Sequence, residues 1–283
     1  MVRDGDAMTD TQRPEIGNTA DAGGIKINYL EAGRGEPVVL IHGSGPGVSA
    51  YANWRLVIPA LAEQFRVIAP DMVGFGFTER PGNLEYGVQT WADQVLALMD
   101  TLGIRSAHLV GNSFGGAIAL RIAIGQPDRV NKLVLMGSVG VPFKITEGLE
   151  TVWGYTPSVE NMRKVLDKFA YSRELVSDEL AEVRYRGSME PGWQESFAAM
   201  FPAPRQRWVD AMVTPDDEIR RLPHEALVVH GREDRVIPLE TSYRLLELID
   251  NADLHVFSHC GHWSQIERNA EFNRLVLDFF NRQ

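Results

Sequence analysis

The chain has 283 residues, a length that fits one large domain or one domain with an insertion. Hydrophobic residues make up 44% and charged residues 23% of the chain, so it can bury a sizeable core and is not a disordered protein. The formal net charge is -10 and no run of Lys or Arg occurs, which argues against nucleic acid as a partner.

The single cysteine, Cys260, excludes an intrachain disulfide and metal sites built on paired cysteines. Residues 1–24 are polar and lack the apolar stretch of a secretory signal, and no run of about 18 apolar residues occurs that could span a bilayer. We therefore expect a cytoplasmic protein with no membrane partner. We also expect a flexible N-terminal tail over residues 1–24, with a short lead-in strand as the alternative.

Short apolar runs alternate with helical patterns in the first half of the chain. Four of these runs predict buried strands, at residues 37–43, 66–71, 107–112 and 132–137. Between the second and third runs, apolar side chains recur at helical spacing, and Gly103 follows as a C-terminal cap; they are Trp91, Val95, Leu98, Met99 and Leu102. Such strand–helix–strand units predict a mostly parallel sheet.

The same alternation returns near the C-terminus, with predicted strands at 226–231 and 254–259 and predicted helices at 241–249 and 270–281. Residues 141–213 lack apolar strand runs and contain helical segments such as 158–169 and 177–185. An insertion after the strand at 132–137 lies over the C-terminal edge of the sheet, where open α/β sheets bind ligands. The sequence therefore predicts an α/β core over 25–140 and 214–283, with a helical lid over 141–213.

The segment Gly111-Asn112-Ser113-Phe114-Gly115 matches the pattern G-x-S-x-G between a predicted strand and a predicted helix. In that setting a tight turn exposes the serine hydroxyl, and the helix N-terminus lends positive potential to a developing oxyanion. Ser113 is therefore the predicted nucleophile. A glycine-rich turn without chemistry is the alternative.

A serine nucleophile needs a histidine base and a carboxylate that orients the histidine. Asp234 and His262 each follow a predicted strand, in the chain order Ser, Asp, His of α/β hydrolases. Glu233 and His259 are the alternatives, but Gly261 leaves His262 free to turn inward. The other histidines lie inside or beside predicted strands and are expected to be structural: His108, His224, His230 and His255.

The backbone N–H groups of Phe114 and Ser44 are the predicted oxyanion donors, because the loop at 42–47 is rich in glycine and follows a predicted strand. The patterns HExxH and DxDxDG do not occur, nor does a dinucleotide or phosphate-binding fingerprint. We therefore expect neither a metal nor a cofactor.

From Pro37 to the C-terminus the chain resembles the meta-cleavage product hydrolases, which hydrolyse carbon–carbon bonds in bacterial aromatic catabolism. The segments that carry the resemblance are HGSGPGVSAYANWR, APDMVGFGFTERP, GNSFGG, HGREDRVIP and CGHW. Within the predicted lid, VWGYTPS and FPAPRQRW resemble the branch acting on monocyclic ring-cleavage products, which includes the 2-hydroxymuconic semialdehyde hydrolases and their alkyl-substituted relatives.

The resemblance implies an α/β-hydrolase fold and a cofactor-free reaction. A 2-hydroxy-6-oxohexa-2,4-dienoate would be split into 2-hydroxypenta-2,4-dienoate and a carboxylic acid. Ser113 would attack the C6 carbonyl after ketonisation of the dienol, with His262 as base and acid and Asp234 as its orienting carboxylate. The resemblance also implies assembly as a homo-oligomer.

The positions that match the family's grip on the anionic dienoate end are Asn53, Asn112, Arg184 and Trp263. A solvated lid arginine is the alternative for Arg184, and its rivals for the role are Arg186, Arg205 and Arg207. The group preferred at C6 stays open among hydrogen, methyl, isopropyl and phenyl. Four lid side chains either line that part of the site or belong to the core: Trp153, Met200, Phe201 and Trp208.

Two other functions fit the same residues. A carboxylesterase or thioesterase would use the identical triad, and it would differ in lacking a site for the dienoate. A non-catalytic receptor for a small molecule on the same scaffold would bind its ligand without turnover.

Overall fold

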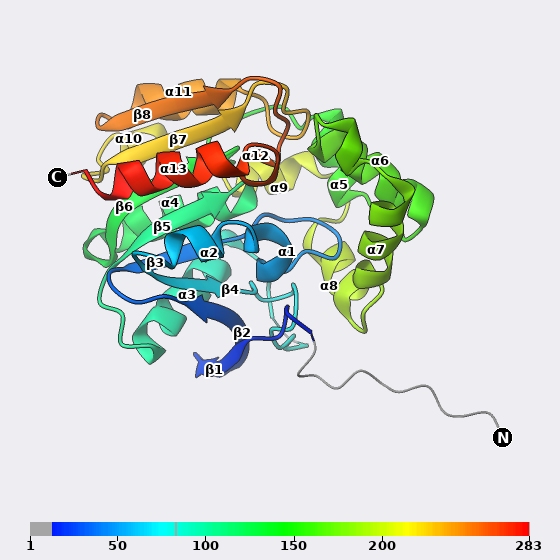
Figure 1. Ribbon diagram of the computed structural model, residues 1–283, viewed down its shortest axis with the longest axis horizontal. Coiled ribbons are helices and arrows are strands. Elements are labelled where there is room, and N and C mark those ends of the chain that lie inside the picture. The colour runs from blue at the N-terminus through cyan, green and yellow to red at the C-terminus, as the bar shows by residue number, and fades with distance from the viewer. Residues whose placement is uncertain (1–12, 83, 283) are drawn as a thin grey trace.

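The computed structural model describes residues 13–82 and 84–282, which form an eight-stranded sheet with helices on both faces (Figure 1). The spatial order of the strands is β1-β2-β4-β3-β5-β6-β7-β8. Their bounds are β1 Asn18–Ala22, β2 Ile25–Ala32, β3 Pro37–Ile41, β4 Arg66–Pro70, β5 Ala107–Asn112, β6 Val130–Met136, β7 Ala226–Gly231 and β8 Ala252–Phe257. The β1–β2 and β2–β4 pairs are antiparallel and the other pairs are parallel, which confirms the predicted mostly parallel α/β sheet.

The order of the strands places the predicted site residues together. The chain runs from β3 outward to β4 and then returns to the other side of β3 as β5. Ligands of open α/β sheets bind at such a reversal, beyond the C-terminal ends of the strands. The loop that contains Ser44 follows β3 and the turn at Ser113 follows β5, so both lie at this point.

Of the two expectations for residues 1–24, the short lead-in strand holds for the last part and the tail does not, because residues 18–22 form strand β1 at the edge of the sheet. The pairing with β2 runs from Asn18 opposite Tyr29 to Ala22 opposite Ile25. Ala22 is the one buried residue of β1, so the strand is held by backbone hydrogen bonds and carries no apolar pattern. Residues 1–12 of the expected tail lie outside the described residues.

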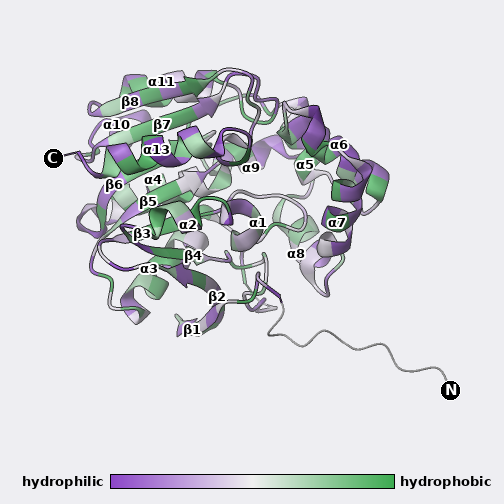
Figure 2. Cartoon of the chain, in the orientation of Figure 1, coloured by the Kyte–Doolittle hydropathy of each residue, from purple (hydrophilic) through white to green (hydrophobic). Residues whose placement is uncertain are grey.

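Two apolar layers enclose the sheet, because successive side chains of a strand point to opposite faces. In β3, Val39 and Ile41 face one layer while Val38 and Leu40 face the other. The first layer includes α3 Val88–Thr101, α4 Phe114–Gly125 and α11 Glu240–Leu248; the second includes α1 Ala50–Trp54, α2 Ile58–Leu61 and α13 Asn269–Phe280. Figure 2 shows the hydrophobic residues concentrated along the central strands.

Residues 141–213 are all described and contain helices but no strand. The helices are α5 Glu147–Trp153, α6 Val159–Phe169, α7 Asp178–Ser188, α8 Trp193–Met200 and α9 Gln206–Ala211, gathered at one end of the sheet (Figure 1). Hydroxyl groups cap the starts of α5, α6 and α7 and account for those boundaries. At the base of this segment the N–H of Thr214 donates to the carbonyl of Gly140 over 2.8 Å.

The shorter helices α10 Asp216–Ile219 and α12 Ser264–Glu267 complete the core. A bilayer-spanning helix, which needs about 20 predominantly apolar residues, is not found within 13–82 and 84–282.

Candidate active site

Ser113 stands at the sharp turn between β5 and α4, with a backbone φ of 55° and ψ of -115°. A positive φ is strained for a residue with a Cβ, so the surrounding turn must hold it. Two glycines make that turn possible. A Cβ on Gly111 would collide with the carbonyl of Gly115, and a Cβ on Gly115 would collide with the carbonyl of Ile41. The sequence thus places a serine at the C-terminal edge of the sheet and at the N-terminus of α4.

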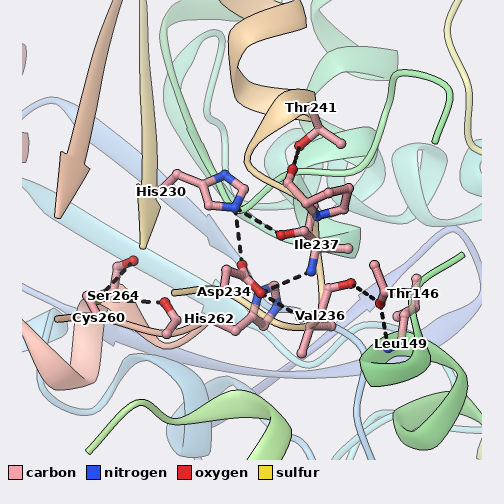
Figure 3. Close-up of polar contacts among 12 residues, drawn as sticks. Thr146, Leu149, His230, Asp234, Val236, Ile237, Thr241, Cys260, His262 and Ser264 are labelled. Carbon is pink, nitrogen blue, oxygen red and sulfur yellow. Dashed lines mark hydrogen bonds and ion pairs between the residues drawn. The ribbon is translucent and has the colours of Figure 1, made fainter. Parts of the chain in front are cut away.

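Asp234 follows β7, His262 follows β8, and their side chains meet with 2.7 Å between Oδ2 and Nδ1 (Figure 3). The other carboxylate oxygen, Oδ1, accepts the N–H groups of Val236 at 2.7 Å and Ile237 at 3.0 Å. Burial alone would raise the pKa of Asp234, but its contacts with His262 and His230 hold that pKa well below its usual range. An ionised Asp234 keeps the proton of His262 on Nδ1 and leaves Nε2 as the basic nitrogen.

Phe169, at the end of α6, positions the ring of His262. The N–H of His262 donates to the carbonyl of Phe169 over 2.8 Å, and the two rings stack with centroids 5.6 Å apart. Phe169 also stacks on Trp263, with centroids 4.8 Å apart. A Cβ on Gly261 would crowd this carbonyl, which explains a glycine next to the histidine. Sequence reasoning missed Phe169, because an apolar residue at the end of an amphipathic helix gives the same signal as any core residue.

The alternative acid and base lie in other contacts. The carboxylate of Glu233 accepts the N–H of Cys260 at 3.0 Å and forms an ion pair with Arg232 at 2.8 Å. The ring of His259 packs beside Tyr171, with centroids 5.6 Å apart. The structure therefore brings together Asp234 and His262, whereas Glu233 extends from the turn after β7 and accepts a hydrogen bond from the turn after β8.

The two predicted oxyanion donors border Ser113. Phe114 is the first residue of α4, so its N–H has no acceptor in a preceding helical turn. A Cβ on Gly43 would lie 3.5 Å from the Cβ of Ser113, which places the loop after β3 beside the serine. In the part of the chain that the structure describes, the N–H of Ser44 makes no backbone hydrogen bond.

His42 fixes the start of this loop and was not singled out from the sequence. Its Nδ1 lies 2.8 Å from the carbonyl of Gly43, and its Nε2 lies 2.9 Å from the backbone nitrogen of Met72. Nδ1 must therefore donate and Nε2 must accept, so the ring is neutral. Burial lowers the pKa of His42 to about 4.

Aromatic residues of the 141–213 segment close over this loop. The indole N–H of Trp153 donates to the hydroxyl of Ser44 over 2.9 Å, and its ring stacks on Phe201 with centroids 4.3 Å apart. Phe201 in turn packs edge-on against Phe114, with centroids 6.4 Å apart. Trp208 lines an outer groove instead.

Three of the four predicted binding residues, Asn53, Arg184 and Trp263, line one cavity of about 50 Å³. The fourth joins them indirectly, because the amide of Asn112 donates to the amide oxygen of Asn53 over 3.2 Å. One water occupies about 30 Å³ of liquid volume, so the cavity has room for one small polar group. Arg55 also lines it and was missed, because an exposed arginine at a helix end carries no sequence signal.

Arg184 lines this cavity from α7. Burial, together with the nearby charge of Arg55, lowers the pKa of Arg184 to about 10. No carboxylate within the described ranges pairs with its guanidinium, and its Nε–H lacks a hydrogen-bond partner. A buried guanidinium without a carboxylate partner favours an anion beside it. Two of the three rivals differ in having a counter-ion, because Arg186 pairs with Glu182 and Arg205 with Glu150. The third, Arg207, lies over the ring of Trp208 and donates to the carbonyl of Pro202 over 3.3 Å.

Groups of three or more His, Cys, Asp or Glu side chains that could hold a metal ion do not occur in residues 13–82 and 84–282.

Comparison with known proteins places this geometry in a family. The model of the alpha/beta hydrolase fold family matches residues 36–269. A 2-hydroxy-6-oxo-2,4-heptadienoate hydrolase of Pseudomonas putida strain F1 is 62% identical over 265 residues, which cover 94% of this chain and 96% of that protein. A 2-hydroxymuconate semialdehyde hydrolase of Pseudomonas sp. strain CF600 is 59% identical over 266 residues, 94% of each chain.

A solved structure has the same architecture. It is the meta-cleavage product hydrolase CumD of Pseudomonas fluorescens IP01, a serine-to-alanine mutant complexed with acetates. It is 59% identical, with a TM-score of 0.94 over 95% of this chain and 99% of that one. Taken with the serine turn and the Asp–His pair at the strand ends, these likenesses show that the chain belongs to the meta-cleavage product hydrolases of the α/β hydrolase fold.

Proposed function

We propose that the chain hydrolyses the C5–C6 bond of 2-hydroxy-6-oxohexa-2,4-dienoates, giving 2-hydroxypenta-2,4-dienoate and a carboxylic acid. The observation that carries this proposal is the guanidinium of Arg184, which lines a small cavity and pairs with no carboxylate among the described residues. An ester substrate does not require an anion site, whereas the dienoate has a carboxylate to fill it. The names of the relatives from strains F1 and CF600 support the same substrate class.

In this proposal Arg184, Asn53 and Trp263 hold the carboxylate end, and Asn112 acts through Asn53. The dienol first ketonises, which moves a proton from the C2 hydroxyl to C5. His262 Nε2 then takes the proton of Ser113, because its Nδ1–H is held by Asp234.

Ser113 Oγ adds to the C6 carbonyl, and the N–H groups of Ser44 and Phe114 stabilise the oxyanion. The C5–C6 bond breaks as the oxyanion returns to a carbonyl of acyl-Ser113 and the bonding electrons move through C4 and C3 to the C2 oxygen, which takes up the proton held by His262. Water then releases the carboxylic acid from Ser113. The aromatic rings of Trp153 and Phe201, which pack beside Phe114, supply an apolar wall for the C6 substituent.

Turnover followed by absorbance tests the proposal. Dienoates with hydrogen, methyl, isopropyl or phenyl at C6 are compared with p-nitrophenyl acetate as the ester control, and Ser113→Ala is the control for the nucleophile. Fast loss of the dienoate chromophore supports carbon–carbon hydrolysis, and the rate order of the four substrates gives the size of the pocket. Cleavage of the ester alone would leave an esterase, and binding without turnover would leave a receptor.

We further propose that the enzyme is a cytoplasmic homo-oligomer. Two large apolar side chains that stay exposed at one helix, α7, support an interface there; they are Val183 at 59% and Met189 at 49% exposure. Sedimentation of the purified protein tests the assembly, and a monomer at micromolar concentration would contradict it.

A further inference from the structure

His230, a buried residue of β7, lies against Asp234 on the side opposite the catalytic histidine. Figure 3 shows the carboxylate of Asp234 between the rings of His230 and His262. The Nε2 atom of His230 is 3.3 Å from Oδ2 of Asp234, the same oxygen that lies 2.7 Å from Nδ1 of His262. Two imidazole rings therefore share one carboxylate oxygen.

The neighbours of His230 determine which of its nitrogens carries the proton. Nε2 faces two acceptors, Oδ2 of Asp234 and the carbonyl of Ile237 at 3.1 Å, so it must be the donor. Nδ1 lies 2.6 Å from the hydroxyl of Ser242, which can donate to it. The neutral ring is thus satisfied on both sides, and Ser242 holds the tautomer whose N–H points at Asp234.

From this geometry we propose that His230 is a positioning residue for the catalytic pair. Its N–H competes with that of His262 for Oδ2 of Asp234, and so weakens the hydrogen bond between that carboxylate and Nδ1–H of His262. The inference rests on the roles proposed above for Ser113, Asp234 and His262. It adds a residue that acts through Asp234 and does not touch the substrate.

The competition predicts the direction in which loss of His230 changes the interaction between Asp234 and His262. A hydrogen bond to a carboxylate stabilises its charge and reduces the interaction left for a second donor. Without the N–H of His230, the charge of Asp234 acts more fully on His262 and favours the imidazolium. Other titratable groups lie near this carboxylate. Burial raises the pKa of the Cys260 thiol to about 12, so the thiol stays neutral, while the flanking Glu233 and Arg235 pair with Arg232 and Asp167.

The orientation of Asp234 does not depend on His230 alone, since Oδ1 still accepts the N–H groups of Val236 and Ile237. Loss of His230 should therefore alter the pH dependence more than the maximal rate. This separates positioning from simple support of the fold, which would lower the rate and leave the pH dependence unchanged.

The test compares His230→Leu, which removes the donor, with His230→Gln, whose amide N–H can replace Nε2–H. Profiles of kcat/KM against pH are measured for the dienoate and for p-nitrophenyl acetate. In His230→Leu we expect the acidic limb of the kcat/KM profile to move to a higher pH by about half to one pH unit, while kcat/KM on the plateau falls less than about 10-fold. His230→Gln should restore the wild-type limb.

Two further variants complete the experiment. Ser242→Ala removes the partner that fixes the tautomer, and should shift the limb in the same direction by a smaller amount. His108→Leu is the matched control, because His108 is also buried in a strand but at the opposite end of β5 from Ser113. The proposal is overturned if the acidic limb of the pH profile stays in place in folded His230→Leu, or if it shifts by the same amount in His108→Leu. If His230→Leu does not fold, an acidic limb that stays in place in Ser242→Ala overturns the proposal.

A readout without turnover separates this inference from the proposed reaction. The low-field proton resonance of His262 Nδ1–H reports its hydrogen bond to Asp234, and it can be recorded in Ser113→Ala. It should shift when His230→Leu is added and return with His230→Gln. Failure of dienoate turnover would contradict the proposed substrate, whereas an unchanged resonance in the His230→Leu variant would contradict the proposed role of His230.

Discussion

The indole N–H of Trp153 in α5 donates to the hydroxyl of Ser44 over 2.9 Å, although the two residues are 109 positions apart in the chain. Ser44 belongs to the loop that we propose as the source of an oxyanion donor, and Trp153 belongs to the helical segment above it. The bond ties the position of that segment to the position of the donor.

Removing this hydrogen bond should lower the free energy of unfolding, and the loss should be shared between its two partners rather than be the sum of two separate effects. Trp153→Phe keeps a ring to stack on Phe201 but loses the N–H, and Ser44→Ala loses the acceptor. A double-mutant cycle in urea should give a coupling free energy of about 1 kcal/mol. Trp208→Phe is the control, because its N–H bonds to the carbonyl of Pro202 instead. Additive effects of Trp153→Phe and Ser44→Ala would contradict the link.

The strained backbone of Ser113 predicts a difference between two inactive variants. Ser113→Ala keeps the Cβ at a φ of 55°, whereas Ser113→Gly removes it. Both should lose turnover by at least about 1000-fold, as expected for a missing nucleophile. Denaturant unfolding should find Ser113→Gly more stable than Ser113→Ala by about 1 kcal/mol. Equal stability would mean that the turn does not store strain at this residue.

Arg184 should matter for the anionic substrate only. Arg184→Ala should raise KM for the dienoate by about 10-fold or more and leave the hydrolysis of p-nitrophenyl acetate nearly unchanged. The matched control is Arg186→Ala on the same helix, where the guanidinium is exposed and pairs with Glu182. An unchanged kcat/KM for the dienoate would return Arg184 to a structural role.

His42 predicts a specific loss of stability in acid. Its pKa in the folded protein is about 4, below the ordinary 6.5, so the unfolded chain takes up the proton first as the pH falls. The contribution of His42 to the free energy of unfolding is intact above about pH 6.5. It is lost progressively down to about pH 4, and the total loss is about 3 kcal/mol. His42→Gln keeps an acceptor for the N–H of Met72 without a titrating ring.

Unfolding free energies of wild type and His42→Gln, measured from pH 7 to pH 3.5, check this expectation. The wild type should lose more stability than the variant across that window. Parallel curves would show that another group accounts for acid unfolding.

Much of the sheet was predictable from the sequence, because a strand buried on both faces is a continuous apolar run. The runs at 107–112 and 226–231 coincide with β5 and β7, and the run at 66–71 exceeds β4 by one residue. From the sequence, strand β1 was only the alternative to a tail, since an exposed edge strand carries no apolar pattern.

The site was predictable where chemistry dictates residue order, and not where it depends on packing. Ser113, Asp234 and His262 follow strands in a known sequence of types, so their convergence could be expected. His230 gives no such signal, because a histidine within an apolar strand is ordinarily a satisfied core residue. Its contact with Asp234 depends on the turn after β7, which only the folded chain reveals.

The hydrogen bond between Gly140 and Thr214 joins the two ends of the helical segment at its base, next to the paired strands β6 and β7. The segment therefore leaves and re-enters the core at one point. Its helices can be lengthened, shortened or exchanged between relatives without a change in strand register. Because Ser113, Asp234 and His262 all lie outside it, natural variation and chimeric enzymes can diversify substrate choice separately from the catalytic machinery, provided that contacts such as Trp153 with Ser44 are kept.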